Sequence, residues 1–410
     1  MVHKTTDRAG LYYWAGPGTI RMIELKFPGA RIDYASLLAS YDLSVLQKLQ
    51  EKLSLTDVWV SFSWGFSQKT EAEDYAFIRE KLAHFRKLNL RVHAYVQGLN
   101  LVVDDNQDHD YYGKDWYGRL LPYHRGRKMT CPNNPYFQKY IAQKIHLALK
   151  EDFDGVFVDN VNFGQFPILV AGGWTTFFGC KCIYCQNEFK KQTGLEIPKL
   201  FHIGSDVYNA YLAFRKKSIT AFVAALSKQV KNKKRLFGTN SFDPKYDTAL
   251  VYGTDLERLE KLQDYFLFEN HDLPRFGAQP RSNSHLKTIL KTLQKPTFIV
   301  SYKKGVGRES HFAQRDIDAV FTESATLGYN PCYKGTEYTT RGIWHNLYYN
   351  KITYPTIRKI PRTSKLKNKR MLGSKFIRLY NRFYNPILTS QFENKYARRA
   401  LSWLYYRAIH

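Results

Sequence analysis

Between residues 11 and 332, the sequence alternates short apolar or aromatic segments with longer amphipathic ones. The short segments have the length and composition of buried β-strands, and the alternation is typical of parallel β-α-β units. It therefore favours a fold built on a parallel sheet. Eight strands are predicted, at Leu11–Trp14, Val58–Trp64, Arg91–Gln97, Gly155–Asn160, Leu236–Ser241, Tyr265–Asn270, Thr297–Tyr302 and Thr326–Cys332.

The segments between these strands predict helices, because their apolar residues recur at helical spacing. Eight strands alternating with helices can close a (β/α)8 TIM barrel, whose active site lies at the carboxyl ends of the strands. A doubly wound open sheet is the alternative, but the first strand is not followed by the glycine-rich phosphate turn of that fold. Helices are predicted at Ala72–Leu88, Pro135–Leu149, Tyr208–Val230, Leu256–Leu262, Leu286–Leu293 and Gln314–Ala325.

Two long insertions follow strands three and four, at about residues 98–134 and 161–206. Both are expected on the carboxyl face of the barrel, where long loops commonly build substrate pockets. Pro355 and Pro361 mark a change in composition near the end of the barrel. We therefore predict a barrel domain over residues 1–350 and a basic, aromatic-rich C-terminal extension over residues 351–410.

The C-terminal extension carries much of the chain's net charge of +26. Residues 351–410 hold 15 Lys or Arg and one acid, Glu393, so 14 of the 26 net charges lie there. A basic segment of this kind favours an anionic partner, and we expect an anionic polysaccharide or a membrane surface rather than nucleic acid. A helix that packs its aromatic residues on the barrel and leaves its cations in water is the alternative.

Nothing in the sequence predicts a membrane span or a secretory leader. No stretch reaches the ~18 consecutive apolar residues of a transmembrane helix. The segment MVHKTTDRAG has no apolar run of the kind a signal peptide needs. We therefore expect a cytoplasmic protein, with membrane association through the extension as a variant.

Two carboxylates follow apolar strands at the predicted carboxyl face. FDGVFVDNV, residues 153–161, delivers Asp159 to the end of strand four, and DYFLFENHD, residues 264–272, delivers Glu269 to the end of strand six. Glycoside hydrolysis uses such a pair: one carboxylate attacks or activates water, and the other protonates the leaving oxygen. We predict Asp159 and Glu269 as that pair. A structural aspartate that caps a following turn is the other interpretation of Asp159.

Polar and aromatic side chains also end several other predicted strands. Amides and hydroxyls can hydrogen-bond sugar hydroxyls, and aromatic faces can stack on a pyranose. Packing within the core is the alternative for each of them taken singly. The residues predicted to bind substrate are Trp64, Tyr95, Gln97, Asn160, Asn240, Asp243, Asn270, Tyr302 and Lys303.

Three cysteines form a C-x-C-x2-C cluster in the second insertion, Cys180, Cys182 and Cys185. Cys131, from the first insertion, can supply a fourth thiolate, which would complete a closed structural zinc site. Reduced thiols in a packed loop are the alternative. The odd total of five cysteines does not favour a disulfide scaffold. Catalysis by a carboxylate pair requires no cofactor, so zinc is expected to be structural only.

The stretches TCPNNPYFQKYIAQKI, DFDGVFVDNV and CKCIYCQNEFKKQTGLEIP resemble uncharacterised glycosyl hydrolases of the (β/α)8-barrel type, and the resemblance covers about residues 55–335. The strand-four motif is also similar to the α-galactosidase-like clan. That similarity implies that Asp159 is the nucleophile of a retaining hydrolase and that Glu269 is its acid/base. The chain departs from the clan in having Glu rather than Asp at the second position, and Val161 where many members have Cys.

The predicted function is therefore a glycoside hydrolase acting on an oligo- or polysaccharide. A non-catalytic carbohydrate-binding or polysaccharide-biosynthesis protein on the same barrel is the alternative, because a fold does not determine a function. The motifs HExxH, GxSxG and the Walker loop are absent from the sequence. The sequence therefore gives little support to a metalloprotease, a serine hydrolase or a P-loop NTPase.

Overall fold

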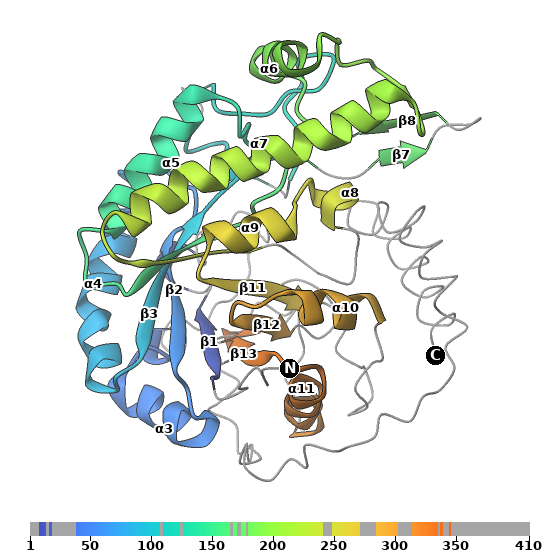
Figure 1. Cartoon of the computed structure of the whole chain (residues 1–410). Coiled ribbons are helices and arrows are strands. Elements are labelled where there is room, and N and C mark those ends of the chain that lie inside the picture. The colour runs from blue at the N-terminus through green and yellow to red at the C-terminus, as the bar shows by residue number, and fades with distance from the viewer. Residues whose placement is uncertain are drawn as a thin grey trace.

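The computed structural model describes residues 8–13, 16–18, 38–106, 110–123, 126–164, 167–169, 174–177, 179–240, 248–270, 284–301, 314–334, 337–338 and 344–345. Its centre is a closed barrel of parallel strands in the order β1-β13-β12-β11-β10-β6-β3-β2 (Figure 1). The predicted (β/α)8 barrel is therefore confirmed. The barrel strands are β1 (Gly10–Tyr13), β2 (Asp57–Ser63), β3 (Arg91–Gln97), β6 (Gly155–Asp159), β10 (Leu236–Asn240), β11 (Tyr265–Asn270), β12 (Thr297–Ser301) and β13 (Asn330–Lys334).

Helices lie around the outside of the barrel, between successive strands (Figure 1). The predicted helices are all present, and their ends lie within two residues of the predicted ones. The helices are α3 (Leu43–Leu53), α4 (Ala72–Lys87), α5 (Pro135–Ala148), α6 (Ile183–Thr193), α7 (Asp206–Lys231), α8 (Thr248–Tyr252), α9 (Leu256–Leu262), α10 (Ser284–Thr292) and α11 (Gln314–Leu327). None of the described helices is both long and apolar enough to cross a membrane.

The eighth strand differs from its predicted position. Its predicted start, Thr326, belongs to α11, which continues to Leu327. The helix ends at Gly328, whose φ of 77° is a left-handed conformation that glycine adopts without steric cost. The chain then enters β13 at Asn330. The predicted strand starts too early because residues 326–332 include both the end of α11 and the start of β13.

The barrel strands are buried on both faces, as expected for parallel strands covered by helices. Alternate residues point to opposite faces of a strand. One set packs against the helices, and the other fills the barrel interior with large rings such as Trp59, Tyr95, Phe157 and Tyr265. The interior is therefore a packed core, with polar side chains from several strands at its two ends.

A buried ion-pair cluster closes the opposite, amino end of the barrel around Asp57. This carboxylate is fully buried and lies 2.5 Å from Nη2 of Arg8, 3.2 Å from Nη2 of Arg91 and 3.2 Å from Nε2 of His93. Burial alone would raise the pKa of Asp57, but the hydrogen bonds and charges of His93 and Arg8 outweigh it and hold the pKa well below its usual range. Asp57 is therefore ionised in the fold and binds the ends of β1, β2 and β3 together.

Both long insertions form small antiparallel sheets beside the barrel. The first contains β4 (Asn100–Val102) paired with β5 (Arg127–Met129). The second contains β7 (Pro167–Leu169), β8 (Trp174–Phe177) and β9 (Phe201–His202), together with α6. The predicted C-terminal extension, residues 351–410, lies outside the described residues.

Candidate active site

Strand periodicity directs Asp159 into the barrel. In β6, Val156 and Val158 pack on the helix side, and Phe157 belongs to the interior cluster. Asp159 is two residues beyond Phe157, so it shares the interior face at the carboxyl end of the strand. Its register partner on β3 is Gln97. The apolar strand thus places one carboxylate at the mouth of the barrel, as predicted.

The same alternation places Glu269 and Asn240 beside it. In β11, Tyr265 and Leu267 face the interior, so Glu269 follows them on that face. Asn240 ends β10, which lies between β6 and β11 in the barrel. Three consecutive strands therefore contribute one polar side chain each to the same layer at the carboxyl end.

One amide connects the two carboxylates. Nδ2 of Asn240 donates to Oδ1 of Asp159 at 2.6 Å and to Oε1 of Glu269 at 2.6 Å. The two accepting oxygens are therefore at most twice 2.6 Å, or 5.2 Å, apart. Asp159 is 4% exposed and Glu269 is 8% exposed. The predicted pair is thus brought together in a nearly water-free setting.

Asp159 accepts two further hydrogen bonds, both at Oδ2. The hydroxyl of Tyr95 donates to it, and Nδ2 of Asn160 donates at 2.6 Å. Burial raises the pKa of Asp159, while the hydrogen bonds from Tyr95, Asn240 and Asn160 lower it in part. Burial and the charge of Asp159 both raise the pKa of Tyr95, so its hydroxyl remains a proton donor. These donors offset part of the effect of burial, but the pKa of Asp159 remains raised.

Gln97 completes the layer on β3. Its Oε1 accepts a hydrogen bond from the Tyr95 hydroxyl at 2.8 Å, and it is 1% exposed. Among the described residues, its Nε2 has no hydrogen-bond partner.

The backbone around Asp159 is tightly constrained. Asn160 has a φ of 53°, a left-handed conformation that Asn tolerates better than most residues. The N–H of Gly98 donates to the carbonyl oxygen of Asp159 at 2.9 Å. A Cβ at position 98 would lie 2.2 Å from that oxygen, closer than any real contact. Gly98 thus permits the close approach of the β3 and β6 ends that fixes Asp159.

Trp64 lies against the site but is buried. Its ring stacks on Tyr95, with centroids 5.4 Å apart and an interplanar angle of 26°. The guanidinium of Arg127 lies 5.6 Å from the Trp64 ring centroid. Trp64 is only 5% exposed. The structure therefore places it where it supports the Tyr95 ring, and its predicted contact with substrate stays a prediction.

Two functional candidates of the first insertion were missed from the sequence. Tyr123 donates its hydroxyl proton to Oδ1 of Asn160, the neighbour of Asp159. Arg127 is 3% exposed, and its charge lowers the pKa of Asp159 in part. Neither residue ends a barrel strand or belongs to a periodic pattern, so strand-end reasoning had no means to select them.

Glu71 is a further buried carboxylate that the sequence reading did not single out. Its Oε1 accepts the backbone N–H groups of Trp64, Gly65 and Phe66 at 2.8, 2.9 and 3.0 Å. Nζ of Lys144 lies 2.5 Å from its Oε2. Glu71 therefore fixes the loop after β2 that carries Trp64, which is a structural role beside the site.

Of the residues predicted to bind substrate, five are described in full: Trp64, Tyr95, Gln97, Asn160 and Asn240. They lie at the carboxyl end of the barrel together with the carboxylate pair. The backbone of Asn270 ends β11, but its side chain is outside the described part. Asp243, Tyr302 and Lys303 also lie outside the described residues.

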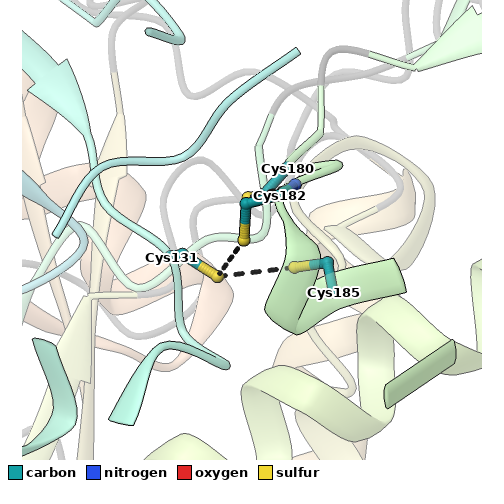
Figure 2. A group of neighbouring side chains, drawn as sticks. All are labelled: Cys131, Cys180, Cys182 and Cys185. Atoms are coloured by element: carbon teal, nitrogen blue, oxygen red, sulfur yellow. Dashed lines mark hydrogen bonds between the residues drawn. The ribbon is translucent and has the colours of Figure 1, made fainter. Parts of the chain in front are cut away.

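The four predicted metal ligands gather in one place, between the two insertions (Figure 2). Their sulfur atoms all lie within 4.8 Å of one another, and all four side chains are buried. The residues are Cys131, Cys180, Cys182 and Cys185. The fifth cysteine, Cys332, lies apart from them in the barrel interior.

A cavity of about 280 Å³ lies between the insertions, next to this cysteine cluster. Its lining includes Lys114, Trp116, Lys181 and Cys182, but neither Asp159 nor Glu269. Burial lowers the pKa of Lys181 to about 8. The predicted carboxylate pair lies in the barrel, so we take the carboxyl end of the barrel, and not this cavity, as the candidate active site.

The barrel is similar to several solved structures. The β-galactosidase from Rahnella sp. R3 has a TM-score of 0.54 at 12% identity, covering 81% of this chain and 50% of that one. The β-galactosidase from Marinomonas ef1 has a TM-score of 0.52 at 12% identity, covering 80% of this chain and 53% of that one. The chain thus spans about half the length of these two proteins.

The catalytic domain of β-amylase from Paenibacillus polymyxa has a TM-score of 0.51 at 7% identity, covering 80% of this chain and 92% of that one. At such identities, the likeness shows the barrel fold alone. Neither a protein-family model nor a curated protein sequence matches this chain.

Proposed function

We propose that this protein is a retaining glycoside hydrolase that acts on an oligo- or polysaccharide. The observation that carries the proposal is the convergence of Asp159 and Glu269 on one amide at the carboxyl end of the barrel. In barrels of this type, residues at that end of the strands perform the chemistry. The similar solved structures are named β-galactosidase and β-amylase, which supports a carbohydrate substrate through fold likeness only.

The separation of the two carboxylates supports retention. Retaining enzymes hold their carboxyl groups about 5–5.5 Å apart, and inverting enzymes hold them about 6.5–9.5 Å apart to admit a water molecule. The shared amide limits the nearest oxygens of Asp159 and Glu269 to 5.2 Å, twice the 2.6 Å bond.

The hydrogen bonds that Asp159 accepts support one division of roles. Asp159 accepts hydrogen bonds from Tyr95, Asn160 and Asn240, which stabilise the negative charge that a nucleophile needs. In the first step, a carboxylate oxygen of Asp159 attacks the anomeric carbon while Glu269 protonates the leaving oxygen. In the second step, Glu269 removes a proton from water, which attacks the same carbon and releases Asp159.

This chemistry requires no metal or organic cofactor, since the two carboxylates supply the nucleophile and the proton. We propose that Gln97 and Asn240, which lie in the same layer as the carboxylates, contribute to binding the sugar. The basic extension over residues 351–410 is proposed to bind an anionic polysaccharide or a membrane surface. It is the part of the chain most suited to hold a polymeric substrate or an anionic boundary near the barrel.

The test measures the release of reducing ends from a panel of polysaccharides. Wild type is expected to release them from at least one polymer, and Asp159→Asn and Glu269→Gln are expected to release none above background. The matched control is Asp264→Asn, because Asp264 lies at the amino end of the strand that carries Glu269. Binding of a polymer by wild type without release of reducing ends would favour the carbohydrate-binding alternative.

A further inference from the structure

We propose that Cys131, Cys180, Cys182 and Cys185 hold one structural Zn²⁺ ion, and that this ion fixes the first insertion against the barrel mouth. The second clause rests on the proposed function, because it concerns residues that contact the candidate active site. The first clause does not, since it concerns only the cluster itself. Cys131 lies 49 residues before Cys180, the first of the other three cysteines, so the ion would join two otherwise separate loops.

The sulfur positions fit a tetrahedral zinc ion. Zn–S bonds of ~2.3 Å at tetrahedral angles place neighbouring sulfurs about 3.8 Å apart. Sγ of Cys131 lies 3.4 Å from Sγ of Cys185 and 3.5 Å from Sγ of Cys182 (Figure 2). A disulfide would require about 2.05 Å. These sulfurs are therefore too far apart for disulfides. Binding of a zinc ion would require them to move only slightly, to a somewhat larger separation.

The chemistry of the ligand set selects zinc. Four thiolates around one point are the ligand set of structural zinc sites, and carboxylate or carbonyl oxygens are what calcium and magnesium need. Every ligand is buried, so no position is left open to water, as in a closed site. The lack of an open position also means that this ion would not take part in the glycosidic chemistry.

The groups around the sulfurs suit the charge of such a site. Zinc with four thiolates has a net charge of −2. Nδ2 of Asn133 lies 3.4 Å from Sγ of Cys185, and the N–H of Cys182 lies 3.5 Å from Sγ of Cys180. Lys114 and Lys181 line the adjoining cavity beside Cys182. These donors and cations would stabilise the thiolates, as the second shell of a metal site does.

The helix that carries two of the ligands begins at the cluster. Cys182 is the N-cap of α6, and Cys185 lies in its first turn. The N-terminus of a helix has a partial positive charge, which favours thiolates at this position. The sulfurs of Cys182 and Cys185 both point toward that of Cys131 (Figure 2).

The first insertion connects the cluster to the candidate active site. Cys131 lies two residues after the end of β5, and β5 begins at Arg127, whose guanidinium lies over Trp64. The N–H of Thr130 donates to the carbonyl of Leu99, just after β3. Fixing Cys131 thus limits the movement of β5 and of Tyr123, which contacts Asn160. The ion would therefore fix the positions of β5 and Tyr123 beside the candidate active site without taking part in that site.

The first experiment determines the metal directly. The full chain is purified in reducing buffer without added metal, and its metal content is measured by mass spectrometry. One zinc per chain is expected. Replacement by Co²⁺ is expected to give the intense thiolate-to-cobalt charge-transfer bands and the visible bands of a tetrahedral site. Zinc below about 0.1 per chain together with no cobalt bands would overturn the proposal, and one iron per chain would overturn the choice of ion.

Single substitutions locate the site. Cys182→Ser and Cys185→Ser are expected to lower bound zinc at least tenfold, while Cys332→Ser, the matched control in the barrel, keeps one zinc per chain. Should the cluster variants not fold, titration of the wild-type zinc protein with a mercurial reagent replaces them. Release of one zinc as four thiols react supports the site, and release without loss of four thiols contradicts it.

Hydrogen exchange tests the effect on the first insertion without any sugar. Removal of zinc by a chelator is expected to speed amide exchange at least tenfold over residues 121–131, and to leave β11 and β12 unchanged. Equal exchange with and without zinc would overturn the positioning role. Because none of these readouts uses hydrolysis, failure of the zinc proposal and failure of the hydrolase proposal are distinguishable.

Discussion

Asp159 and Glu269 accept hydrogen bonds from the same atom, Nδ2 of Asn240, at 2.6 Å each. Three neighbouring strands, β6, β10 and β11, supply these three side chains. Below them, the interior positions of β6 and β11 carry Phe157, Tyr265 and Leu267, and β10 has Gly238, against which the Tyr265 ring packs, so the backbone and hence the spacing of the carboxylates is fixed. Pairing of two acids at the mouth of a barrel is therefore a direct consequence of strand alternation and register.

Substitution of Asp159 is expected to remove activity without unfolding the protein. Asp159→Asn and Glu269→Gln are each expected to lower turnover by about 10²–10⁴-fold or more, because each removes a group that acts on the reacting bond. The melting temperature is expected to stay within a few degrees of wild type. Turnover and thermal unfolding of the same preparations check both statements, and retained turnover in both variants would end the assignment.

The stability of Asp159→Asn relative to wild type is expected to increase as the pH rises. Burial raises the pKa of Asp159 in the fold above its unfolded value. Folding therefore favours the protonated form, and ionisation of this carboxyl costs stability as the pH rises through the raised pKa. The melting temperature of Asp159→Asn relative to wild type should rise from pH 4 to pH 8. A relative melting temperature that falls over this range would contradict the stated direction.

Removal of the Tyr95 hydroxyl is expected to shift the pH profile. In Tyr95→Phe, the ionised Asp159 loses a hydrogen bond that lowers its pKa, so the pKa of this carboxyl should rise further. If Asp159 must be ionised to attack, the acidic limb of kcat/KM moves to higher pH. Turnover is expected to fall about 10- to 100-fold, the cost of about 1.5–3 kcal/mol for a hydrogen bond to a charged group.

The control for this change is Tyr75→Phe, whose hydroxyl hydrogen-bonds Glu71 behind the loop after β2. That variant is expected to lose stability but to keep the acidic limb of wild type. An unchanged acidic limb in Tyr95→Phe would show that Tyr95 does not act on Asp159.

Gly98→Ala is expected to impair the site through the backbone. The added methyl would meet the carbonyl oxygen of Asp159 at 2.2 Å, so β3 and β6 must separate at their carboxyl ends. Both turnover and melting temperature should fall. The matched control is Gly16→Ala, where the nearest atom is the Tyr41 hydroxyl at 3.6 Å, an ordinary contact. Equal behaviour of the two variants would contradict the close approach at Gly98.

Asp57→Asn is expected to destabilise the barrel at neutral pH by about 1.5–3 kcal/mol, because it removes the buried carboxylate that pairs with Arg8 and Arg91 and hydrogen-bonds His93. The folded pKa of Asp57 lies below its unfolded value of ~3.9, so its contribution is present above that pH and is lost as the pH falls below it. Urea unfolding at pH 7 and pH 3 measures this. Asp152→Asn, an exposed carboxylate, serves as the control with a change within about 1 kcal/mol.

Much of the barrel and part of the site could be predicted from the sequence, for physical reasons that the structure makes clear. Each barrel strand is only a few residues long, so its apolar run is short, as at Val156–Val158. The residue that follows the run must face either the helices or the barrel interior. Asp159 and Glu269 were found in this way. The start of β13 was not, because Leu327 ends a helix only three residues before the strand begins.

Residues that reach the site from loops could not be found by the same reasoning. Tyr123 and Arg127 lie in an insertion without periodicity, and their contacts with Asn160 and Trp64 depend on how that insertion folds back over the barrel. Glu71 is similar, since its role depends on three backbone N–H groups that a sequence does not display. Spacing alone predicted the cysteine cluster, because three of its members are almost consecutive.

Chemical rescue of the two carboxylate variants tests the paired-carboxylate mechanism most directly. With an activated aryl glycoside that wild type hydrolyses, azide is expected to restore turnover in both Asp159→Ala and Glu269→Ala. Asp159→Ala should give a glycosyl azide of inverted anomeric configuration, because azide replaces the nucleophile. Glu269→Ala should give the retained product, because azide attacks the glycosyl-enzyme. Absence of any glycosyl azide from either variant, while both remain folded, would contradict the account.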